Sequence, residues 1–475
     1  EVVVTERDDR PQKNWLQRLY TDRRNQRINP ILVVVLRDDG QTVDIIGPAG
    51  ENPDVKRGLE TSQVERICES ALDRPDHHAA QRFLSAVLAQ IDEELVGLRN
   101  QGLLSTHELK TGVPDRVDWN DAVSRAEGLL DEKGRDLVEG LGYEIERLQD
   151  HSYILKDTSD GREQAVAVFL NEDESFDHAQ DRFTGQTPVS YALSEADKKN
   201  LDYVIASSES RLRLYTTNPD AGFGSRGRTD TFVEVNTDLL TDDNAGYLSL
   251  LFSSRALQKE GSLHEIMADS KDYAAELGRR LRERIYDDVI PDLAEAIADA
   301  RDLEDPTKDE LDETYRMALI KLYRLLFIAY AEDEGFLPRH NPRYERRSLK
   351  AKAHELHDLR QEGIEFDERS TTHWDDVMEL ARAIHDGHSE WSLPEYNGRL
   401  LSSDENISEA GAKLAEIELT DDQFGPVLAN LLIDESEADD IEGPVDFRNI
   451  GVREFGVIYE GLLESELSLA DQDLT

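Results

Sequence analysis

The hydrophobic pattern of this chain changes near its middle, and that change limits the folds that the chain can adopt. Between residues 142 and 235, short runs of β-branched and aromatic residues are separated by Gly, Asp and Asn, a pattern typical of strands joined by turns. From residue 246 onward, apolar residues recur at the spacing expected for one face of a helix. We therefore predict an α+β fold with more helix than strand.

The same pattern divides the chain into three predicted domains. Residues 1–119 are expected to form a β-hairpin and helices, and residues 120–258 an α/β domain. Residues 259–475 are expected to form an all-helical domain. A chain of 475 residues is long enough to bury several hydrophobic cores.

Individual elements follow from local signals. The apolar runs at residues 31–36 and 43–46 flank Asp39 and Gly40, turn residues that favour a β-hairpin. The polar residue Ser270 is expected to start a helix. The other expected strands are residues 153–155, 165–170, 201–206, 211–216 and 231–235. The expected helices are residues 59–73, 79–99, 120–141, 194–200, 246–258, 262–268, 271–302, 309–333, 348–361, 373–386, 408–416, 421–434 and 451–467.

Charge is the second strong constraint. The chain carries 102 acidic and 54 basic residues, for a net charge of -48. Periodic apolar patterns persist throughout, which argues against a disordered acidic segment. We interpret the acid excess as adaptation to high salt, typical of a halophilic archaeon, because salt at about 1 M shortens the Debye length to about 3 Å. Such screening weakens the usual argument that an acidic protein avoids nucleic acid, so local Arg clusters matter more than the total.

The cysteine count and the hydropathy of the sequence argue against a disulfide-bonded, a zinc-binding and a membrane-spanning protein. Cys68 is the only cysteine, so neither an intramolecular disulfide nor a cysteine-based zinc site is expected. His354 and His357 stand three residues apart on an expected helix, without the spacing of a helical zinc motif, and no metal site is predicted. No apolar run reaches 18 residues and no signal peptide opens the sequence. We expect a cytoplasmic protein without a membrane partner.

Three ordered segments carry a family resemblance. They are residues 322–338 (LYRLLFIAYAEDEGFLP), residues 393–400 (LPEYNGRL) and residues 445–464 (VDFRNIGVREFGVIYEGLLE). They resemble segments that precede the catalytic domain in large restriction-modification-type adenine-specific DNA methyltransferases of the Eco57I-like, type IIG-like class. Residues 98–119 also resemble part of that family.

The resemblance implies methylation of adenine N6 in double-stranded DNA, with S-adenosylmethionine as cofactor, in host defence and alongside other defence subunits. The family's catalytic domain would follow the last of these segments. Neither its Asn-Pro-Pro-Tyr-type adenine loop nor its Gly-rich cofactor loop is found in these residues. We therefore expect this chain to be the non-catalytic, DNA-engaging N-terminal portion of such an enzyme.

Two segments match an adenine-binding or a dinucleotide-binding motif only in part. Residues 341–344 (NPRY) look like the adenine loop, but Arg343 replaces the second proline. We predict a loop between helices there, with an Arg-rich surface that contacts DNA. Residues 222–227 (GFGSRG) have the Gly spacing of a dinucleotide-binding loop, but an expected strand follows them instead of a helix. We predict a hairpin loop whose tip contacts phosphates. The DNA-contact candidates are Arg226, Arg228, Arg343, Arg346, Arg347 and Lys350.

The α/β domain resembles the restriction-endonuclease-like domain that such enzymes carry at the N-terminus. An active PD-(D/E)xK site needs an acid at one strand end and Glu-x-Lys on the next strand, where the carboxylates bind Mg²⁺. The expected strand at residues 165–170 has no lysine, so we predict a degenerate nuclease-like domain, with Asp160 and Glu163 as its nuclease candidates. Two alternatives stay open, a Mg²⁺-dependent endonuclease module and a scaffold that binds proteins of a defence complex.

Overall fold

The computed structural model of the protein contains helices and three β-sheets, with about 52% of the residues in helices. The prediction of a mixed fold with more helix than strand is therefore confirmed. The chain divides into two compact units, one of residues 1–222 and 226–271 and one of residues 223–225 and 272–475. The main division falls within helix α8 (Ser262–Arg284). The structure describes residues 2–6, 13–24, 29–37, 41–48, 55–91, 95–171, 174–223, 227–303, 306–436 and 441–463.

The first unit begins with a small sheet of order β1-β2-β3-β4. Strands β2 and β3 pair antiparallel, which confirms the predicted hairpin; its turn residues Asp39 and Gly40 lie outside the described residues. Val33 and Val35 face a core with helix α1, whereas Leu32 and Val34 face a core with α2 and α3. Burial on both faces explains why this strand is apolar without alternation. The elements are β1 (Val2–Glu6), α1 (Lys13–Arg24), β2 (Leu32–Leu36), β3 (Thr42–Ile46), β4 (Lys56–Glu60), α2 (Thr61–Leu72) and α3 (His77–Gln90).

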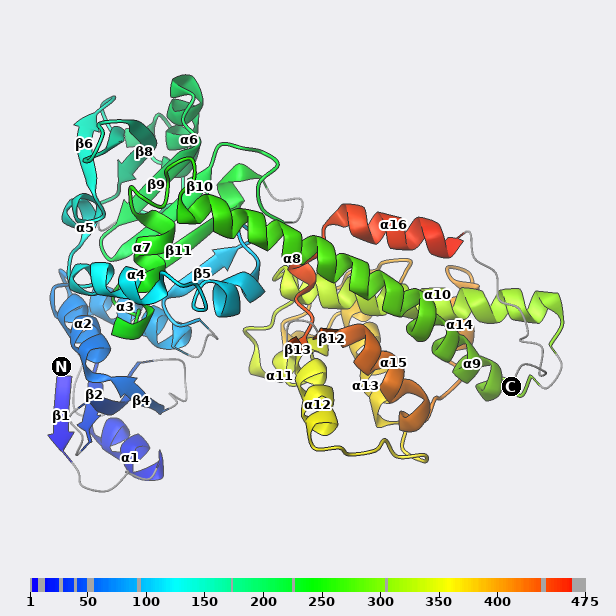
Figure 1. Cartoon of the computed structure of the whole chain (residues 1–475). Helices are drawn as coiled ribbons and strands as arrows, with labels where there is room; N and C mark the ends of the chain where they lie inside the picture. Colours follow the sequence, from blue (N-terminus) through cyan, green and yellow to red (C-terminus); the bar gives the residue numbers. More distant parts are fainter. Residues whose placement is uncertain are drawn as a thin grey trace. The chain divides into compact units, whose positions relative to one another are not determined.

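The same unit contains a seven-stranded mixed sheet of order β5-β11-β10-β9-β8-β7-β6 (Figure 1). All neighbouring strands are antiparallel except β8 and β9, which are parallel and joined through helix α6. The five strands expected in this region are confirmed, and β5 and β6 were not predicted. The strands are β5 (Leu98–Gln101), β6 (Tyr143–Arg147), β7 (Tyr153–Asp157), β8 (Glu163–Phe169), β9 (Tyr203–Ser208), β10 (Arg211–Thr216) and β11 (Phe232–Asn236).

Helices cover both faces of this sheet. Ala165 and Ala167 of β8 share a core with α4 and α7, whereas Val166 and Val168 share a core with α6. Because alternate residues of a strand point to opposite faces, the two cores lie on opposite sides of the sheet. The covering helices are α4 (Trp119–Ala126), α5 (Gly134–Gly140), α6 (Pro188–Lys199) and α7 (Gly246–Phe252).

Several predicted helix limits in this unit are wrong. The helix expected at residues 79–99 ends at Gln90, and residues 98–101 form strand β5. Gly97 precedes that strand with a φ of +79°, a conformation that ends regular structure and suits glycine. The helix expected at residues 120–141 is two helices, α4 and α5, and Gly134, the first residue of α5, has a φ of +58°.

Two further limits are also wrong. The helix expected at residues 194–200 begins earlier, at Pro188, where the Thr187 side chain accepts a hydrogen bond from the Ser190 N–H. The helix expected at residues 246–258 ends at Phe252, because Ser253 adopts an extended conformation.

The second unit is mainly helical. The expected helices at residues 309–333, 348–361 and 373–386 are confirmed within one residue at either end. The start predicted at Ser270 is wrong, because Ser270 is fully buried inside α8. The helices after α8 are α9 (Ile290–Ala300), α10 (Lys308–Asp333), α11 (Pro342–Glu345), α12 (Leu349–Gln361), α13 (Thr372–Asp386), α14 (Glu409–Leu414), α15 (Asp421–Leu432) and α16 (Val452–Leu463).

The prediction of an all-helical region after residue 259 is wrong. Strands β12 (Ile433–Ser436) and β13 (Ile441–Pro444) form an antiparallel pair. The Asp434 carboxylate accepts hydrogen bonds from Arg280 (2.6 Å) and Arg284 (3.3 Å) of α8. These contacts come from residues about 150 positions earlier, so local periodicity did not reveal that the helix stops at Leu432.

Helix α10 lies at the centre of the second core. Leu322, Leu325 and Ile328 are fully buried, and α9, α12 and α14 pack around the helix. Its apolar residues lie on nearly every side, a pattern typical of a deeply buried helix. Within the described part of the chain, no helix combines the length and the apolar character needed to cross a membrane.

Candidate nucleic-acid-binding site

The predicted nuclease residues lie in the turn between β7 and β8. Asp160 accepts a hydrogen bond from the Arg162 N–H (2.9 Å) and forms an ion pair with the Arg162 side chain (3.2 Å). Glu163 is exposed at the start of β8, opposite Lys156 in register, and Lys156 is paired with Glu146. Asp160 therefore stabilises the turn through local contacts.

The residues that follow Glu163 do not complete the expected motif. The position two residues later, where a Glu-x-Lys motif needs lysine, is Ala165, which is fully buried. Among the described residues, no three His, Cys, Asp or Glu side chains are grouped so that they could hold one metal ion.

The predicted loop with Gly spacing joins β10 to β11, which pair antiparallel as expected of a hairpin. Arg226 lies outside the described residues. Arg228 donates two hydrogen bonds to the Asp197 carboxylate of α6 (2.8 and 3.0 Å) and one to the Thr217 carbonyl (2.9 Å). The hydrogen bond with Asp197 raises the pKa of the Arg228 guanidinium. Arg228 thus ties the hairpin to α6.

The second predicted group lies on α11 and at the start of α12. Arg343 pairs with Glu390 (2.6 Å), Arg347 pairs with Glu379 (2.5 Å), and Lys350 lies 3.4 Å from the buried Asp333. These three side chains therefore already have carboxylate partners.

The remaining residues of this group have separate roles. Arg346 is exposed and forms no ion pair with a described carboxylate. Asn341, the first residue of the NPRY segment, caps α11 by accepting the Arg343 N–H (2.9 Å). The prediction of a loop between helices is wrong for most of this segment, because Pro342–Glu345 form the short helix α11 and only Asn341 precedes it.

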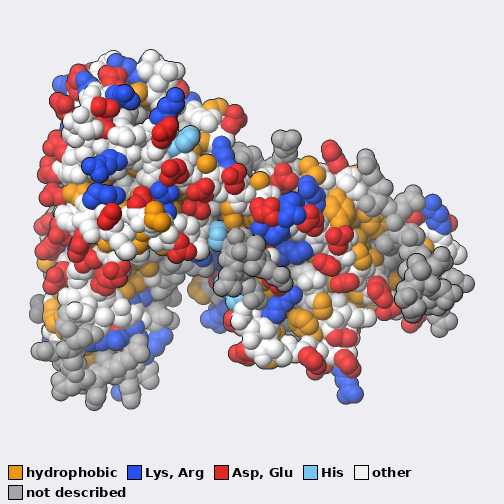
Figure 2. Space-filling view, in the orientation of Figure 1, with side chains coloured by type: hydrophobic (Ala, Val, Ile, Leu, Met, Phe, Trp, Pro, Cys, Tyr) orange, Lys and Arg blue, Asp and Glu red, His pale blue; other side chains and the backbone are white. Residues whose placement is uncertain are grey.

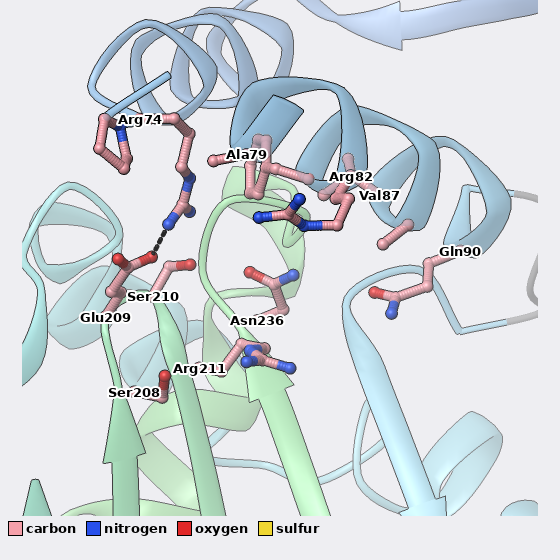
Figure 3. Close-up of a pocket in the computed structure, with 13 residues that line it drawn as sticks. Arg74, Ala79, Arg82, Val87, Gln90, Ser208, Glu209, Ser210, Arg211 and Asn236 are labelled. Atoms are coloured by element: carbon pink, nitrogen blue, oxygen red, sulfur yellow. Dashed lines mark ion pairs between the residues drawn. The ribbon is translucent and has the colours of Figure 1, made fainter. Parts of the chain in front are cut away.

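A different arginine cluster surrounds a cavity of about 390 Å³ in the first unit (Figure 3). We call it the arginine pocket. One wall comes from α3 and the turn before it, and the other comes from one end of strands β9, β10 and β11. Its lining residues are Arg74, Pro75, Ala79, Arg82, Phe83, Ala86, Val87, Gln90, Ser208, Glu209, Ser210, Arg211 and Asn236.

The strand wall follows from the register of the sheet. Arg211 of β10 is the direct partner of Ser208 on β9 and of Asn236 on β11. Side chains at paired positions project from the same face of a sheet, so these three line one row of the pocket. Figure 3 shows the Asn236 amide between the Arg82 guanidinium on the helix wall and the Arg211 guanidinium on the strand wall. The Asn236 side-chain oxygen accepts the Asp238 N–H (3.2 Å), which orients the amide.

The helix wall follows from the start of α3. Asp76 caps this helix by accepting the N–H groups of His78 and Ala79, both at 2.8 Å. Arg74 therefore stands in the turn just before the helix, and Arg82 stands on its second turn. Val87 and Leu88 hold the helix in place by packing into a core with strands β2 and β3, which also contains Leu239, a residue that follows β11.

The pocket carries an excess of positive charge. Arg74 pairs with Glu209 (2.5 Å), and its guanidinium lies 4.5 Å from the centre of the Phe83 ring. Neither Arg82 nor Arg211 forms an ion pair with a carboxylate in the described part of the chain. Three guanidiniums therefore face one carboxylate, in a chain with a net charge of -48.

The neighbouring Arg213 differs from Arg211, because carboxylates neutralise its charge. Arg213, two residues further along the same face of β10, is buried and paired with both Glu234 and Asp177. Tyr215 also accepts a hydrogen bond from its guanidinium (3.3 Å). Arg211 has no such partners and keeps its donors available toward the cavity. Figure 2 shows acidic side chains spread over one face of the described surface, with basic side chains among them.

Sequence reasoning missed this pocket. Arg74 lies just after one expected helix and Arg82 lies in the next, whereas Arg211 belongs to an expected strand more than 120 residues later. The sequence did contain one signal of a basic face. Arg211 and Arg213 are two positions apart on an apolar strand, so both project from the same face of the sheet. Convergence of that face with α3 depends on tertiary packing.

The chemistry of the arginine pocket is that of an anion site. Guanidiniums donate hydrogen bonds in a planar fork that matches phosphate oxygens, and each retains its charge at every accessible pH. The amides of Gln90 and Asn236 add neutral donors and acceptors at the rim. No family model matches this chain, and no similar protein was found among curated proteins or solved structures.

Proposed function

We propose that this chain is the non-catalytic, DNA-engaging N-terminal portion of a restriction-modification-type DNA adenine-N6 methyltransferase that acts in host defence. The observation that carries the DNA-binding part is the arginine pocket, where Arg74, Arg82 and Arg211 face one carboxylate in a strongly acidic chain. The methyltransferase part rests on the resemblance of residues 322–338, 393–400 and 445–464. In this proposal, S-adenosylmethionine and methyl transfer belong to the catalytic domain of the parent enzyme, which is cytoplasmic.

The pocket is proposed to contact phosphates of double-stranded DNA. Phosphate contacts supply most of the sequence-independent affinity for DNA and set the position of a protein on the duplex. Salt screens the repulsion between DNA and distant carboxylates more strongly than it weakens a direct guanidinium–phosphate contact. A local basic pocket is therefore compatible with a large overall negative charge.

The test is binding of a fluorescent duplex by the purified chain over a series of KCl concentrations. The variant Arg82→Met with Arg211→Met should bind about tenfold more weakly, to the same degree for unrelated sequences. Its plot of log affinity against log salt should be shallower by about 2, because each lost phosphate contact accounts for about 0.9. The matched control is Arg279→Met with Arg282→Met on α8, which removes the same charge outside the pocket.

Three results of this binding experiment would contradict the proposal or part of it. If the pocket variant keeps the affinity and slope of the wild-type chain, the pocket does not contact DNA. If the wild-type chain binds no duplex even at low salt, the DNA-engaging function is wrong and a protein-binding scaffold is favoured. Equal losses in the pocket variant and the control would show only a general charge effect, and would also overturn the pocket assignment.

The nuclease alternative has less support. Asp160 and Glu163 are close in the β7–β8 hairpin, but the buried Ala165 occupies the position that needs lysine. We therefore do not propose DNA cleavage by this domain. Cleavage of plasmid DNA with Mg²⁺, abolished by Asp160→Ala or Glu163→Ala, would favour the nuclease alternative.

A further inference from the structure

A second polar cavity lies in the first unit, with a volume of about 550 Å³. We call it the serine pocket. It is formed by the end of α4, the turn between α5 and β6, the β7–β8 turn, and the segment that includes α7 and the residues after it. Its lining residues are Arg125, Ala126, Leu129, Gly140, Leu141, Gly142, Asp157, Thr158, Ser159, Ser249, Ser253, Ser254, Arg255 and Gln258. It shares no lining residue with the arginine pocket.

Asp157 is the one carboxylate among the lining residues, and hydrogen bonds already occupy both of its oxygens, so it is not free to bind a cation. Asp157 is 2% exposed. One oxygen accepts the N–H and the hydroxyl of Ser159 (2.8 and 2.7 Å), and the other accepts the side-chain amides of Gln258 (2.8 Å) and Gln164 (3.3 Å). Burial alone would raise the pKa of Asp157, but these hydrogen bonds outweigh it and lower the pKa. The carboxylate is thus held as a structural acceptor in the wall.

The two cations of the lining are available. Arg125 contacts only the Ser249 hydroxyl, at 3.4 Å, and both Arg125 and Arg255 have exposed side chains. Neither forms an ion pair with any carboxylate that the structure describes. Both guanidiniums therefore keep donors for a ligand of this cavity, in a chain where acids outnumber bases 102 to 54.

Hydroxyl groups occupy the rest of the polar lining. The Ser253 hydroxyl accepts the Ala256 N–H (3.2 Å), so its own proton remains available to a ligand. Ser254 is tied in place through its N–H, which donates to the Leu141 carbonyl (3.0 Å). Gly142 has a φ of +94°, and a Cβ there would lie 2.7 Å from the Ser254 hydroxyl oxygen. The glycine therefore keeps this wall open where hydroxyls gather.

From this lining we propose that the serine pocket binds a small phosphate monoester, with Arg125 and Arg255 on the phosphate and the serine hydroxyls on the hydroxylated remainder of the ligand. Guanidinium forks suit the phosphate oxygens, and hydroxyls suit an alcohol because they both donate and accept. No aromatic side chain lines the cavity, so the lining offers no ring on which a nucleobase would stack. A sugar or polyol phosphate fits this lining better than a nucleotide.

The experiment is calorimetric titration of the full chain with glycerol 3-phosphate, inorganic phosphate and glycerol. Glycerol 3-phosphate should bind at least as tightly as inorganic phosphate, and glycerol should give no signal. The variant Arg125→Met with Arg255→Met should weaken binding of both phosphates by at least tenfold. Because both side chains are exposed, this variant should keep the wild-type circular dichroism spectrum.

The matched control removes the same charge outside both pockets. The variant Arg279→Met with Arg282→Met on α8 should bind glycerol 3-phosphate like the wild-type chain. Three results would overturn the proposal: no binding of either phosphate, binding of inorganic phosphate but not of its glycerol ester, or equal loss of binding in the control variant. If the double methionine variant misfolds, the Arg125→Lys and Arg255→Lys single variants decide, since each keeps the charge but loses the planar fork, and unchanged affinity in both would overturn it.

Discussion

At the scale of single residues, the buried carboxylate of Glu332 connects two helices. It accepts hydrogen bonds from the Tyr344 hydroxyl (2.7 Å) and from the N–H groups of Leu349 and Lys350 (3.0 Å each), at the start of α12. Burial raises the pKa of Glu332 from 4.5 to about 7, although these hydrogen bonds oppose the shift. The folded chain thus holds this proton more tightly than the unfolded chain does.

The sign of the pH dependence follows from that shift. The contribution of Glu332 to stability is fully present below pH 4.5 and is lost as the pH rises through about 7. We expect the unfolding free energy of the wild-type chain, relative to Glu332→Gln, to fall by up to about 3 kcal/mol over this range. Urea unfolding of both proteins from pH 5 to pH 8 measures this. A difference that stays constant with pH would contradict the assignment.

Lys321 is the opposite case, a buried cation without an acceptor. Its amine is fully buried in α10, unpaired, and lies 3.6 Å from the centre of the Trp374 ring and 4.7 Å from that of Phe424. Burial lowers the pKa of Lys321 well below its usual 10.5. The unfolded chain binds a proton that the folded chain releases, so stability rises with pH toward 10.5.

We therefore expect Lys321→Met to stabilise the chain by about 1–3 kcal/mol at neutral pH, because it removes a buried polar group that has no hydrogen bond. The gain should shrink near pH 10, where the unfolded lysine also begins to lose its proton. Urea unfolding at the two pH values compares the variants. A loss of stability at neutral pH would show that contacts between the ammonium and the two rings outweigh its burial.

At the scale of elements, the C-terminal end of α10 depends on one glycine. Gly335 has a φ of +75°, and no atom lies within 4 Å of the position that a Cβ would take. Gly335→Ala should therefore destabilise the chain by about 1 kcal/mol through backbone strain alone. Gly398→Ala is the control, because that glycine also has free space but no positive φ. Thermal unfolding compares them, and equal effects would refute the strain argument.

The elements that sequence predicted well are those with strong local signals. Helix α10 carries a capping box at Thr307 and Glu310 and a glycine after its end. Residues adjacent to the helix therefore set where it begins and ends. Strands β5, β6 and β12 carry charged or amide residues and gain their pairing from distant partners. Strand pairing of this kind is a tertiary property, which short polar strands do not reveal in isolation.

At the scale of the whole molecule, the net charge of -48 predicts a dependence of stability on salt. Raising KCl from about 0.1 M to about 1 M shortens the Debye length from about 10 Å to about 3 Å, which weakens repulsion between carboxylates. We expect the melting temperature to rise, by about 2–4 °C for each kcal/mol gained by units of this size. Sucrose at matched osmolality is the control. An unchanged or lower melting temperature in KCl would contradict adaptation to high salt.

The expected DNA contacts stay predictions, and the structure shows which of the expected residues already have partners within the chain. Arg228, Arg343 and Arg347 were expected to contact DNA, yet each has a carboxylate partner within the chain. Sequence shows where arginines are, but whether a guanidinium is neutralised depends on the acids that folding brings beside it.

The positions of helices α10, α12 and α13 and of the β2–β3 and β10–β11 hairpins could be predicted from sequence, because capping residues, turn residues and hydrophobic periodicity act over a few neighbouring positions. Only the tertiary structure decided that Arg74 and Arg82 meet Arg211, and that Asp434 ends a helix by pairing with α8. These contacts join residues more than 120 positions apart. They arise from the packing of whole elements against one another, and no local pattern records which faces will meet.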